Sequence, residues 1–279
     1  MNTFNAITSA VFGLLLAPFG VQRAWSPWVD IVFWSVLGGI VALIVYKHAS
    51  NQKGIAKAKN DIKVHLLEIR LYNEDILGVL TATVKILCKN ALYVGHNLLP
   101  MVVMFVPMMT ILFQLEATYA FAPVAPGTVE ILEVTLDPAH LNVPVTAVTL
   151  ELPPGVTLDA PPVRTADLAL PQIAWRLRVT APGDQVVTVH VGDVAVTKHI
   201  AVGGENRRVP VMRTKSWEGF LYPGEEGLPK DSPVDTIRWQ YPDRDLGWMP
   251  GGEGGILAAF FVLSIVAGLA LKGLFGVTL

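Results

Sequence analysis

The chain has 279 residues, of which 52% are hydrophobic and 16% are charged, and its formal net charge is −2. This composition is membrane-like only in part, because residues 122–250 have ordinary polarity and are numerous enough for one soluble domain. The single cysteine, Cys88, excludes an intramolecular disulfide, so the polar region must be stabilised by packing alone.

The apolar run at the N-terminus is short and is interrupted by Pro18. A signal peptide begins with basic residues, whereas the first basic residue here is Arg23. We therefore predict that residues 1–27 form a short helix in the outer interface of the membrane, with an aromatic anchor at Trp25 and Trp28. An uncleaved signal-like segment is the alternative that the sequence leaves open.

Three later segments are apolar on all sides for the length of a membrane crossing. Residues 28–46 contain one charge, Asp30, and residues 98–115 contain none. Residues 256–271 contain Ser264 as their one side-chain hydrogen-bonding group. At 1.5 Å per residue, the first two segments each cover roughly 27 Å, about the thickness of the hydrocarbon core. The sequence therefore predicts an integral membrane protein with transmembrane helices at 28–47, 97–118 and 254–276.

The charges on either side of the second span differ in sign. Residues 47–97 carry eight Lys and Arg against four Asp and Glu, a net charge of +4, whereas residues 116–253 carry eleven against eighteen, a net charge of −7. Short basic segments beside membrane spans stay in the cytosol. We therefore expect the basic segment and the C-terminus in the cytosol, and the N-terminus and the acidic region outside. In a bacterial inner membrane, the acidic region would lie in the periplasm.

The basic segment, 48–96, has the pattern of a helical hairpin. A first stripe repeats every seven residues, the spacing of a coiled-coil seam: Ile55, Ile62, Ile69 and Ile76. After a turn expected at 73–75, a second stripe follows: Leu77, Leu80, Val84, Leu87, Ala91 and Val94. We predict two antiparallel helices that bury these stripes against each other.

Four lysines near the start of this hairpin are candidate basic contacts: Lys53, Lys57, Lys59 and Lys63. Their partners would be membrane lipid headgroups, ribosomes or nascent chains, since each Lys near an anionic membrane surface contributes about 1 kcal/mol of attraction. The other interpretation is a solvated coiled coil that only tethers the spans. The sequence does not decide between the two.

Between residues 122 and 250, short segments rich in β-branched residues alternate with turn residues. We expect strands at 129–136, 145–152, 174–180, 186–191 and 194–202. Strands spaced in this way indicate a β-sandwich of an immunoglobulin-like kind. Residues 203–250 are dense in Trp, Tyr and Pro, and we expect them to be irregular. The predicted fold class is membrane α + β: three transmembrane helices, a cytosolic helical hairpin and an extracytosolic β-sandwich-like domain.

The sequence carries no motif for catalysis: no Gly-x-Ser-x-Gly elbow, no His-Glu-x-x-His and no phosphate-binding glycine loop. His190 and His199 lie on neighbouring predicted strands, but two satisfied or solvent-facing histidines are the simpler interpretation. We therefore expect no enzymatic activity, no cofactor and no metal. Arg207 and Arg208 form too small a cluster to indicate nucleic-acid binding.

Each predicted span has a face of polar or small residues. Thr110 and Gln114 share a face with Pro107, whose ring leaves a carbonyl without its helical hydrogen bond. Ser35 lies on such a face in the first span, and Ser264 in the third. These faces fit either close helix packing or a shared, partly hydrated groove. The candidate groove residues are Ser35, Lys47, Thr110, Gln114 and Ser264.

The order of these parts resembles the YidC/Oxa-type insertase superfamily. Residues 98–115 (LLPMVVMFVPMMTILFQL), with prolines seven apart, look like its second core span, and residues 51–72 (NQKGIAKAKNDIKVHLLEIRLY) look like its hairpin. Residues 260–277 (FFVLSIVAGLALKGLFGV) resemble the last span of the three-span branch, which includes the insertase subunit of the endoplasmic-reticulum membrane protein complex. The resemblance covers residues 1–120 and 254–277.

This resemblance implies a hydrated three-helix groove that helps segments of newly made membrane proteins enter the bilayer. Hydration lowers the cost of moving polar backbone through hydrocarbon. Many members of the superfamily place an arginine in the groove, whereas the first span here has only Lys47 at its cytosolic end. The alternative function is an accessory or scaffold subunit of a larger membrane complex, whose β domain binds a protein partner outside the membrane.

Overall fold

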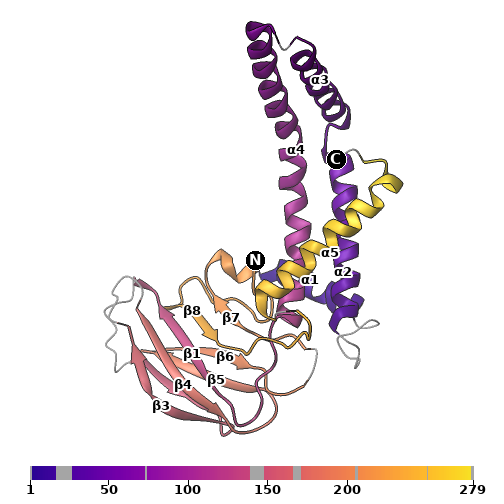
Figure 1. Ribbon diagram of the computed structural model, residues 1–279. Coiled ribbons are helices and arrows are strands. Elements are labelled where there is room, and N and C mark those ends of the chain that lie inside the picture. Colours follow the sequence, from indigo (N-terminus) through magenta and orange to yellow (C-terminus); the bar gives the residue numbers. More distant parts are fainter. Residues whose placement is uncertain are drawn as a thin grey trace. The chain divides into compact units, whose positions relative to one another are not determined.

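Figure 1 shows the computed structural model of the chain. The structure describes residues 2–16, 27–72, 74–138, 148–165, 171–204, 207–249 and 251–277. Trp25, the turn residue Asn73 and the start of the expected 145–152 strand lie outside these residues. The chain forms two compact units, which we describe separately: Met1–Ile31 with Leu112–Ala259, and Val32–Ile111 with Phe260–Leu279.

Among the described residues, three helices are long and apolar enough to cross a membrane: α2 (Pro27–Ala49), α4 (Ile76–Tyr119) and α5 (Gly252–Phe275). They support the assignment of the chain as an integral membrane protein. Helix α4 continues without a break from the second arm of the hairpin into the expected second span, over 44 residues that include Pro100 and Pro107. We expected one helix to end and another to begin near residue 97, because the sequence changes there from an amphipathic pattern to a fully apolar one.

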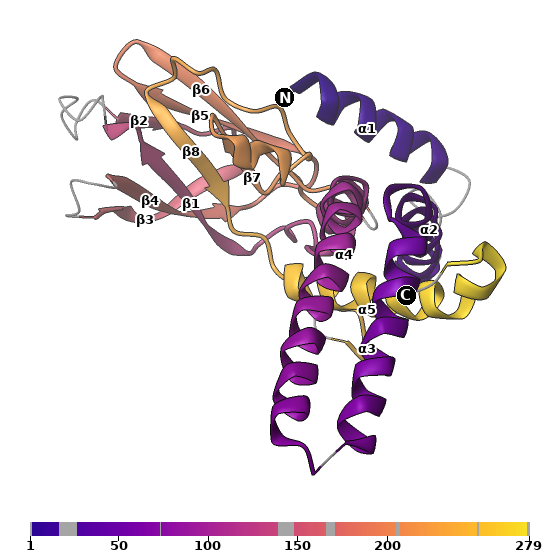
Figure 2. The same ribbon diagram turned by 90° about the horizontal axis from the view of Figure 1, so that it is seen from above.

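The first arm of the hairpin is α3 (Gln52–Leu71), and Figures 1 and 2 both show it beside the first half of α4. The Asn51 side chain caps its start by accepting a hydrogen bond from the Gly54 N–H at 2.9 Å. Lys89 Nζ on α4 lies 2.8 Å from Asp61 Oδ2 on α3. Ile55 is fully buried in a cluster with Leu43 and Tyr46 of α2, so the base of the hairpin packs against that helix.

The prediction that two apolar stripes bury each other in the hairpin is wrong. The second stripe is exposed: Leu77, Leu80, Val84, Leu87 and Val94 each keep more than half of their accessible surface. Helix α4 instead turns Ala82, which is buried, and Lys89 toward α3. Heptad spacing identifies a face of a helix, but it does not say which neighbour that face meets.

In the first unit, α1 (Asn2–Leu16) is a short helix where an interfacial one was expected. Along one side it exposes apolar residues at helical spacing: Phe4, Ile7, Val11 and Leu14. Phe4 contacts Phe220 of the short helix η3 (Trp217–Phe220), with ring centroids 5.2 Å apart. Trp28, one residue of the expected aromatic anchor, stacks on Trp248 with ring centroids 4.8 Å apart.

Among the described residues, eight strands form the β region of this unit, in two sheets. They are β1 (Val129–Leu136), β2 (Val148–Glu151), β3 (Val156–Arg164), β4 (Gln172–Val179), β5 (Gln185–Val191), β6 (Val194–Ile200), β7 (Met212–Thr214) and β8 (Val234–Trp239). One sheet has the order β3-β4-β1-β8-β7 and the other β2-β5-β6, and all the strand pairs are antiparallel. Residues from both sheets share one buried apolar cluster, for example Leu132, Trp239 and Val189. This common core holds the two layers together.

Strands β1, β2, β4, β5 and β6 overlap the segments that the sequence marks as strands, whereas β3, β7 and β8 do not. Strand β3 contains Pro161 and Pro162, which are tolerated because it is an edge strand with an irregular register. Strand β8 lies inside the stretch that we expected to be irregular. It pairs with β1, from Leu132 opposite Trp239 to Leu136 opposite Val234, so part of this stretch belongs to the larger sheet.

Candidate functional site

In the second unit, a cavity of about 520 Å³ lies between α2, α4 and α5. Its wall is mostly apolar, and α4 contributes four methionines to it: Met101, Met104, Met108 and Met109. Small residues open the space on the other helices, namely Gly39 and Ala42 on α2 and Gly268 on α5. Its volume is in the range of small-ligand pockets. One residue of an α-helix with its side chain occupies about 140 Å³, so the cavity has room for roughly one turn of another helix.

Polar side chains line the cavity from all three of its helices, and those on α2 and α4 contact each other. The Tyr46 hydroxyl on α2 donates a hydrogen bond to Asn97 Oδ1 on α4. Asn97 Nδ2 donates in turn to the Tyr93 carbonyl at 2.6 Å. This tyrosine–amide pair links α2 to α4 close to the end of α2 that carries Lys47. Because Tyr46 is buried, the pair is a fixed polar point in an otherwise apolar wall.

Helices α2 and α5 approach each other closely beside the cavity. Ser264 Oγ donates a hydrogen bond to the Ser35 carbonyl at 2.9 Å, and both residues are buried. A Cβ atom on Gly39 would lie 2.7 Å from the Ser264 carbonyl oxygen. The small-residue faces of these two spans therefore serve close packing here, and Ser264 serves the cavity as well.

The five candidate groove residues do not line one common site in the structure. Ser264 lines the cavity, and Ser35 is buried next to it. Thr110 donates to the Val106 carbonyl of its own helix at 2.8 Å, and Lys47 is exposed at the end of α2. Gln114 belongs to the first unit, where it has partners of its own.

A polar cluster surrounds Gln114, which is 2% exposed. Its Nε2 lies 3.3 Å from the hydroxyl oxygens of Thr8 and Ser9 on α1. Its Oε1 accepts a hydrogen bond from Arg208 Nη2 at 2.8 Å. Burial lowers the pKa of the Arg208 guanidinium, which nevertheless stays charged at neutral pH. The cluster therefore places a positive charge against the predicted second span.

Sequence reasoning missed Arg208 as a site residue. From the sequence we considered Arg208 only with Arg207, as too small a cluster for nucleic-acid binding, and we sought a groove arginine in the first span. Gln114 and Arg208 are 94 residues apart, so no local spacing links them. The available signal was a lone glutamine in an apolar helix, which requires hydrogen-bonding partners from elsewhere.

Asp30, the one charge in the first span, is buried in the same unit. The Tyr119 hydroxyl at the end of α4 donates a hydrogen bond to Asp30 Oδ2. Arg244 is also buried, and it donates to the carbonyls of Thr118 and Phe121 at 3.3 and 3.0 Å. These contacts hold the start of α2 and the end of α4 to the β region.

The four lysines of the hairpin lie along α3. Lys53, Lys57 and Lys63 are exposed, as a basic contact surface requires. The fourth, Lys59, places its Nζ 5.6 Å from the ring centroid of Tyr93, so part of its charge is directed at an aromatic face.

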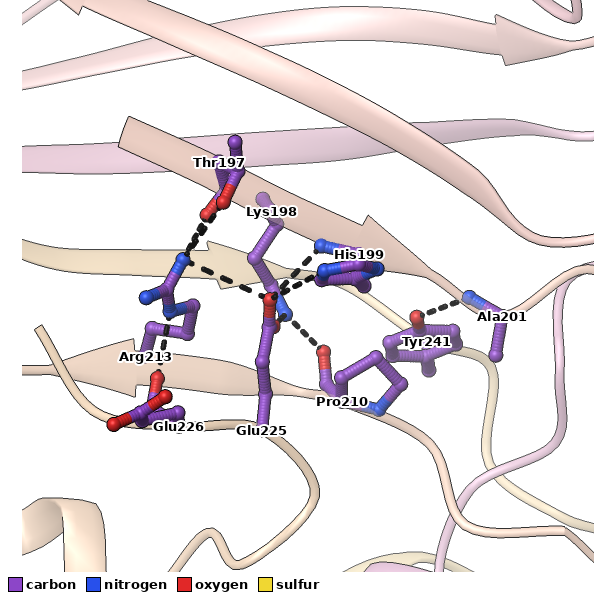
Figure 3. A network of polar contacts seen from close by, with 9 residues as sticks. All are labelled: Thr197, Lys198, His199, Ala201, Pro210, Arg213, Glu225, Glu226 and Tyr241. Carbon is purple, nitrogen blue, oxygen red and sulfur yellow. Dashed lines mark hydrogen bonds and ion pairs between the residues drawn. The ribbon is translucent and has the colours of Figure 1, made fainter. Parts of the chain in front are cut away.

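Figure 3 shows a second polar network, on the β region. Lys198 of β6 is fully buried, and its Nζ donates to Glu225 Oε2 at 2.6 Å and to the Pro210 carbonyl. Glu225 Oε1 accepts from the His199 N–H at 3.1 Å. Burial lowers the pKa of Lys198 to about 8, although Glu225 opposes this shift. The network ties the segment between η3 and β8 to β6.

This network also covers an open sheet edge, because β6 is the last strand of its sheet. In an antiparallel strand, backbone groups point alternately toward the partner strand and away from it. The outward carbonyl of Thr197 accepts from Arg213, and the outward N–H of Ala201 donates to the Tyr241 hydroxyl at 2.9 Å. Side chains therefore occupy edge positions that another chain would otherwise pair with.

The two histidines on β5 and β6 do not form a pair. His190 Nε2 lies 3.0 Å from Glu151 Oε2, and His199 Nε2 lies 4.0 Å from Glu225 Oε1. Within the described part of the chain, no three His, Cys, Asp or Glu side chains are grouped as metal ligands. Comparisons of the chain with protein-family models, with curated proteins and with solved structures found no match.

Proposed function

We propose that this chain is an insertase-like integral membrane protein, which assists the insertion of membrane-protein segments through the cavity between α2, α4 and α5. One observation supports this function most: the cavity lies among three helices apolar enough to span a bilayer, and Asn97 and Ser264 interrupt its apolar wall. A polar segment that enters hydrocarbon loses its hydrogen bonds to water. Hydrogen-bonding side chains in the cavity lower that cost.

The methionine wall on α4 suits clients of varied sequence. Methionine side chains are unbranched and flexible, so Met101, Met104 and Met108 can fit apolar side chains of different shapes. The cavity proposed here is thus more apolar than the groove that the sequence suggested. It would hold part of a hydrophobic segment while the polar pair Tyr46–Asn97 contacts the adjoining backbone.

The cluster around Gln114 supplies the positive charge that such a function uses. Arg208 is half-buried yet stays charged, and its planar guanidinium can bind a carboxylate of a crossing segment with two hydrogen bonds. In this proposal, Arg208 takes the role for which the superfamily uses an arginine within a span.

The orientation follows from charge. The hairpin and the C-terminus would face the cytosol, with Lys53, Lys57 and Lys63 available to lipid headgroups, ribosomes or nascent chains. The β region, which we take to be an immunoglobulin-like sandwich, would lie in the periplasm of a bacterial inner membrane. The clients are newly made membrane proteins, and the proposal requires no cofactor, no metal and no nucleic acid.

Site-specific photo-crosslinking tests the cavity. A photoreactive phenylalanine analogue at Met104, which lines the cavity, should form adducts with pulse-labelled membrane proteins. Val106 is the matched control, because it lies on the same helix, is 59% exposed and does not line the cavity. Equal adduct formation from both positions, or none from Met104 at equal protein level, would overturn the proposed function.

A scaffold role is the second candidate, and the edge of β6 favours it. Ala195 follows the same alternation as Thr197, so its backbone groups point away from β5 beside a groove that includes Pro229, Asp231 and Ser232. An extended segment of an external partner could pair there by strand addition. Ala195→Pro removes an outward N–H of this edge and should block strand addition there, so insertion that is unchanged in Ala195→Pro would favour the insertase over the scaffold.

A further inference from the structure

The first half of α4 carries an apolar stripe that the fold of the chain does not bury. Its members recur at alternating steps of three and four residues: Leu77, Leu80, Val84, Leu87, Ala91, Val94 and Leu98. All seven are exposed, and Leu77, Leu87 and Leu98 keep 75%, 62% and 58% of their accessible surface. Exposing so many large aliphatic side chains along one line is unfavourable where the helix meets water.

The spacing of this stripe is that of a coiled coil. Three consecutive heptads place Leu77, Val84, Ala91 and Leu98 at the first core position, and Leu80, Leu87 and Val94 at the second. The alternation of three and four gives a narrow seam with a period of 3.5 residues. A helix that merely faces lipid has no reason to keep this period, whereas a helix that pairs with one partner helix does.

Helix α3 does not occupy the seam. It meets the opposite side of α4, where Lys89 pairs with Asp61 at 2.8 Å and Ala82 is buried. Both residues stand at the heptad position farthest from the core positions. The stripe is therefore open to a second helix, and α3 need not move to admit one.

The residues that flank the seam indicate which helix fits it. The two flanking heptad positions hold uncharged side chains: Thr81, Cys88 and Gly95 at one, and Thr83, Asn90 and Asn97 at the other. Charges at these positions normally select the partner of a coiled coil. Two identical α4 helices can meet here without repulsion, and nothing at the flanks favours a helix of opposite charge.

We propose that α4 pairs with α4 of a second copy of this chain, as a parallel two-stranded coiled coil over residues 77–98. Because α4 continues into an apolar span, two copies with the same orientation in one membrane have parallel α4 helices. Val84 at the first core position and Leu80 and Leu87 at the second are the kinds of residue that favour two strands. Tyr93 and Asn97 of α4 line the cavity, so the last turn of the stripe, at Val94 and Leu98, runs beside it. The inference does not depend on the proposed insertase function.

Disulfide cross-linking in native membranes tests this seam. In a Cys88→Ala background of the full chain, Ala91→Cys places a thiol in the core, where the two copies face each other across the seam. Mild oxidation should convert this variant to a disulfide-linked dimer. Lys85→Cys is the matched control, since Lys85 is exposed on the same helix but lies away from the stripe, and it should stay monomeric.

Two readouts decide the outcome. When two differently tagged copies are co-expressed, the Ala91→Cys product should contain both tags, and adding Leu87→Glu should abolish it, whereas Lys85→Glu should not. Leu87 is exposed, so its replacement leaves the fold of one copy intact. A product that contains another protein in place of the second tag, or the absence of any product while the protein is present at normal levels, would overturn the proposal.

Discussion

Glu225 Oε2 lies 2.6 Å from Lys198 Nζ in the β region, and the side chains of the two residues are 8% and 0% exposed. Each residue also binds backbone: Lys198 donates to the Pro210 carbonyl, and Glu225 accepts from the His199 N–H. Arg213 stands 3.8 Å from the same carboxylate. The pair therefore joins β6 to two other segments. Because both side chains are buried, each charge is neutralised mainly by the other.

Replacing Lys198 alone should destabilise the protein more than replacing both members of the pair. Lys198→Met leaves the buried carboxylate of Glu225 without its closest cation and should cost about 3 kcal/mol, whereas Lys198→Met with Glu225→Gln should recover much of this loss. Urea unfolding followed by tryptophan fluorescence measures both effects, since Trp175 and Trp239 are buried in the core. Lys230→Met, on the exposed surface, is the control. Equal losses in the single and double variants would contradict the coupling.

Stability should rise as the pH increases from about 8 to 10.5. The pKa of Lys198 is lowered to about 8 by burial, whereas its ordinary value is 10.5. Between these values the unfolded chain binds a proton that the folded chain has released, so raising the pH favours the folded state. Below pH 8 both states are protonated and the contribution is constant. In Lys198→Met the same titration of unfolding free energy should lose this rise, and a rise that persists would assign it to other groups.

Gly39→Ala should disturb the contact of α2 with α5, whereas Gly268→Ala should not. A Cβ at position 39 would lie 2.7 Å from the Ser264 backbone oxygen, and a backbone atom cannot turn aside. A Cβ at position 268 meets no atom within 4 Å. We expect Gly39→Ala to lose about 2 kcal/mol through overpacking and Gly268→Ala to be neutral or slightly stabilising. Melting temperatures of the purified protein in detergent measure both, and similar values would argue against tight packing at Gly39.

Long local patterns made much of the fold predictable. An apolar run of some twenty residues has few alternatives to a membrane-spanning helix. Helices α2 and α4 contain the first two predicted spans, and α5 covers all but the last residue of the third. Strands β1, β4 and β5 were found for a similar reason, since alternating β-branched residues between turn residues rarely form another structure.

The parts that were missed depend on contacts between distant segments. The rotation of α4 that exposes Leu77 and buries Ala82 is fixed by where α3 packs, and no seven-residue pattern contains that information. Strand β8 becomes a strand because β1 offers it a place in the sheet. The Arg208–Gln114 contact joins a loop to a helix, so residue type alone could not reveal it.

Thr110 and Gln114 share a helical face, yet their substitutions should differ. The Thr110 hydroxyl bonds to its own helix at the Val106 carbonyl, so Thr110→Val should leave insertion of a reporter with a short translocated tail unchanged. Gln114→Leu removes the acceptor of Arg208 and leaves a half-buried guanidinium without that hydrogen bond, so insertion should fall about tenfold. Pulse-labelling with protease protection measures both variants at equal protein level. Equal effects of the two substitutions, or no effect of Gln114→Leu, would show that the polar cluster around Gln114 does not contribute to insertion.

Filling the cavity should block insertion without unfolding the protein. Ala42 lines the cavity on α2, and a phenylalanine there would occupy part of its 520 Å³. Ile44 lies two residues further along the same helix, is 43% exposed and does not line the cavity, so Ile44→Phe adds comparable bulk elsewhere. If clients enter this space, Ala42→Phe should lower reporter insertion and Met104 photo-adducts together, while Ile44→Phe lowers neither. Because a filled cavity improves packing, the melting temperature of Ala42→Phe should not fall; lost insertion together with lost stability would point to overpacking of the helices.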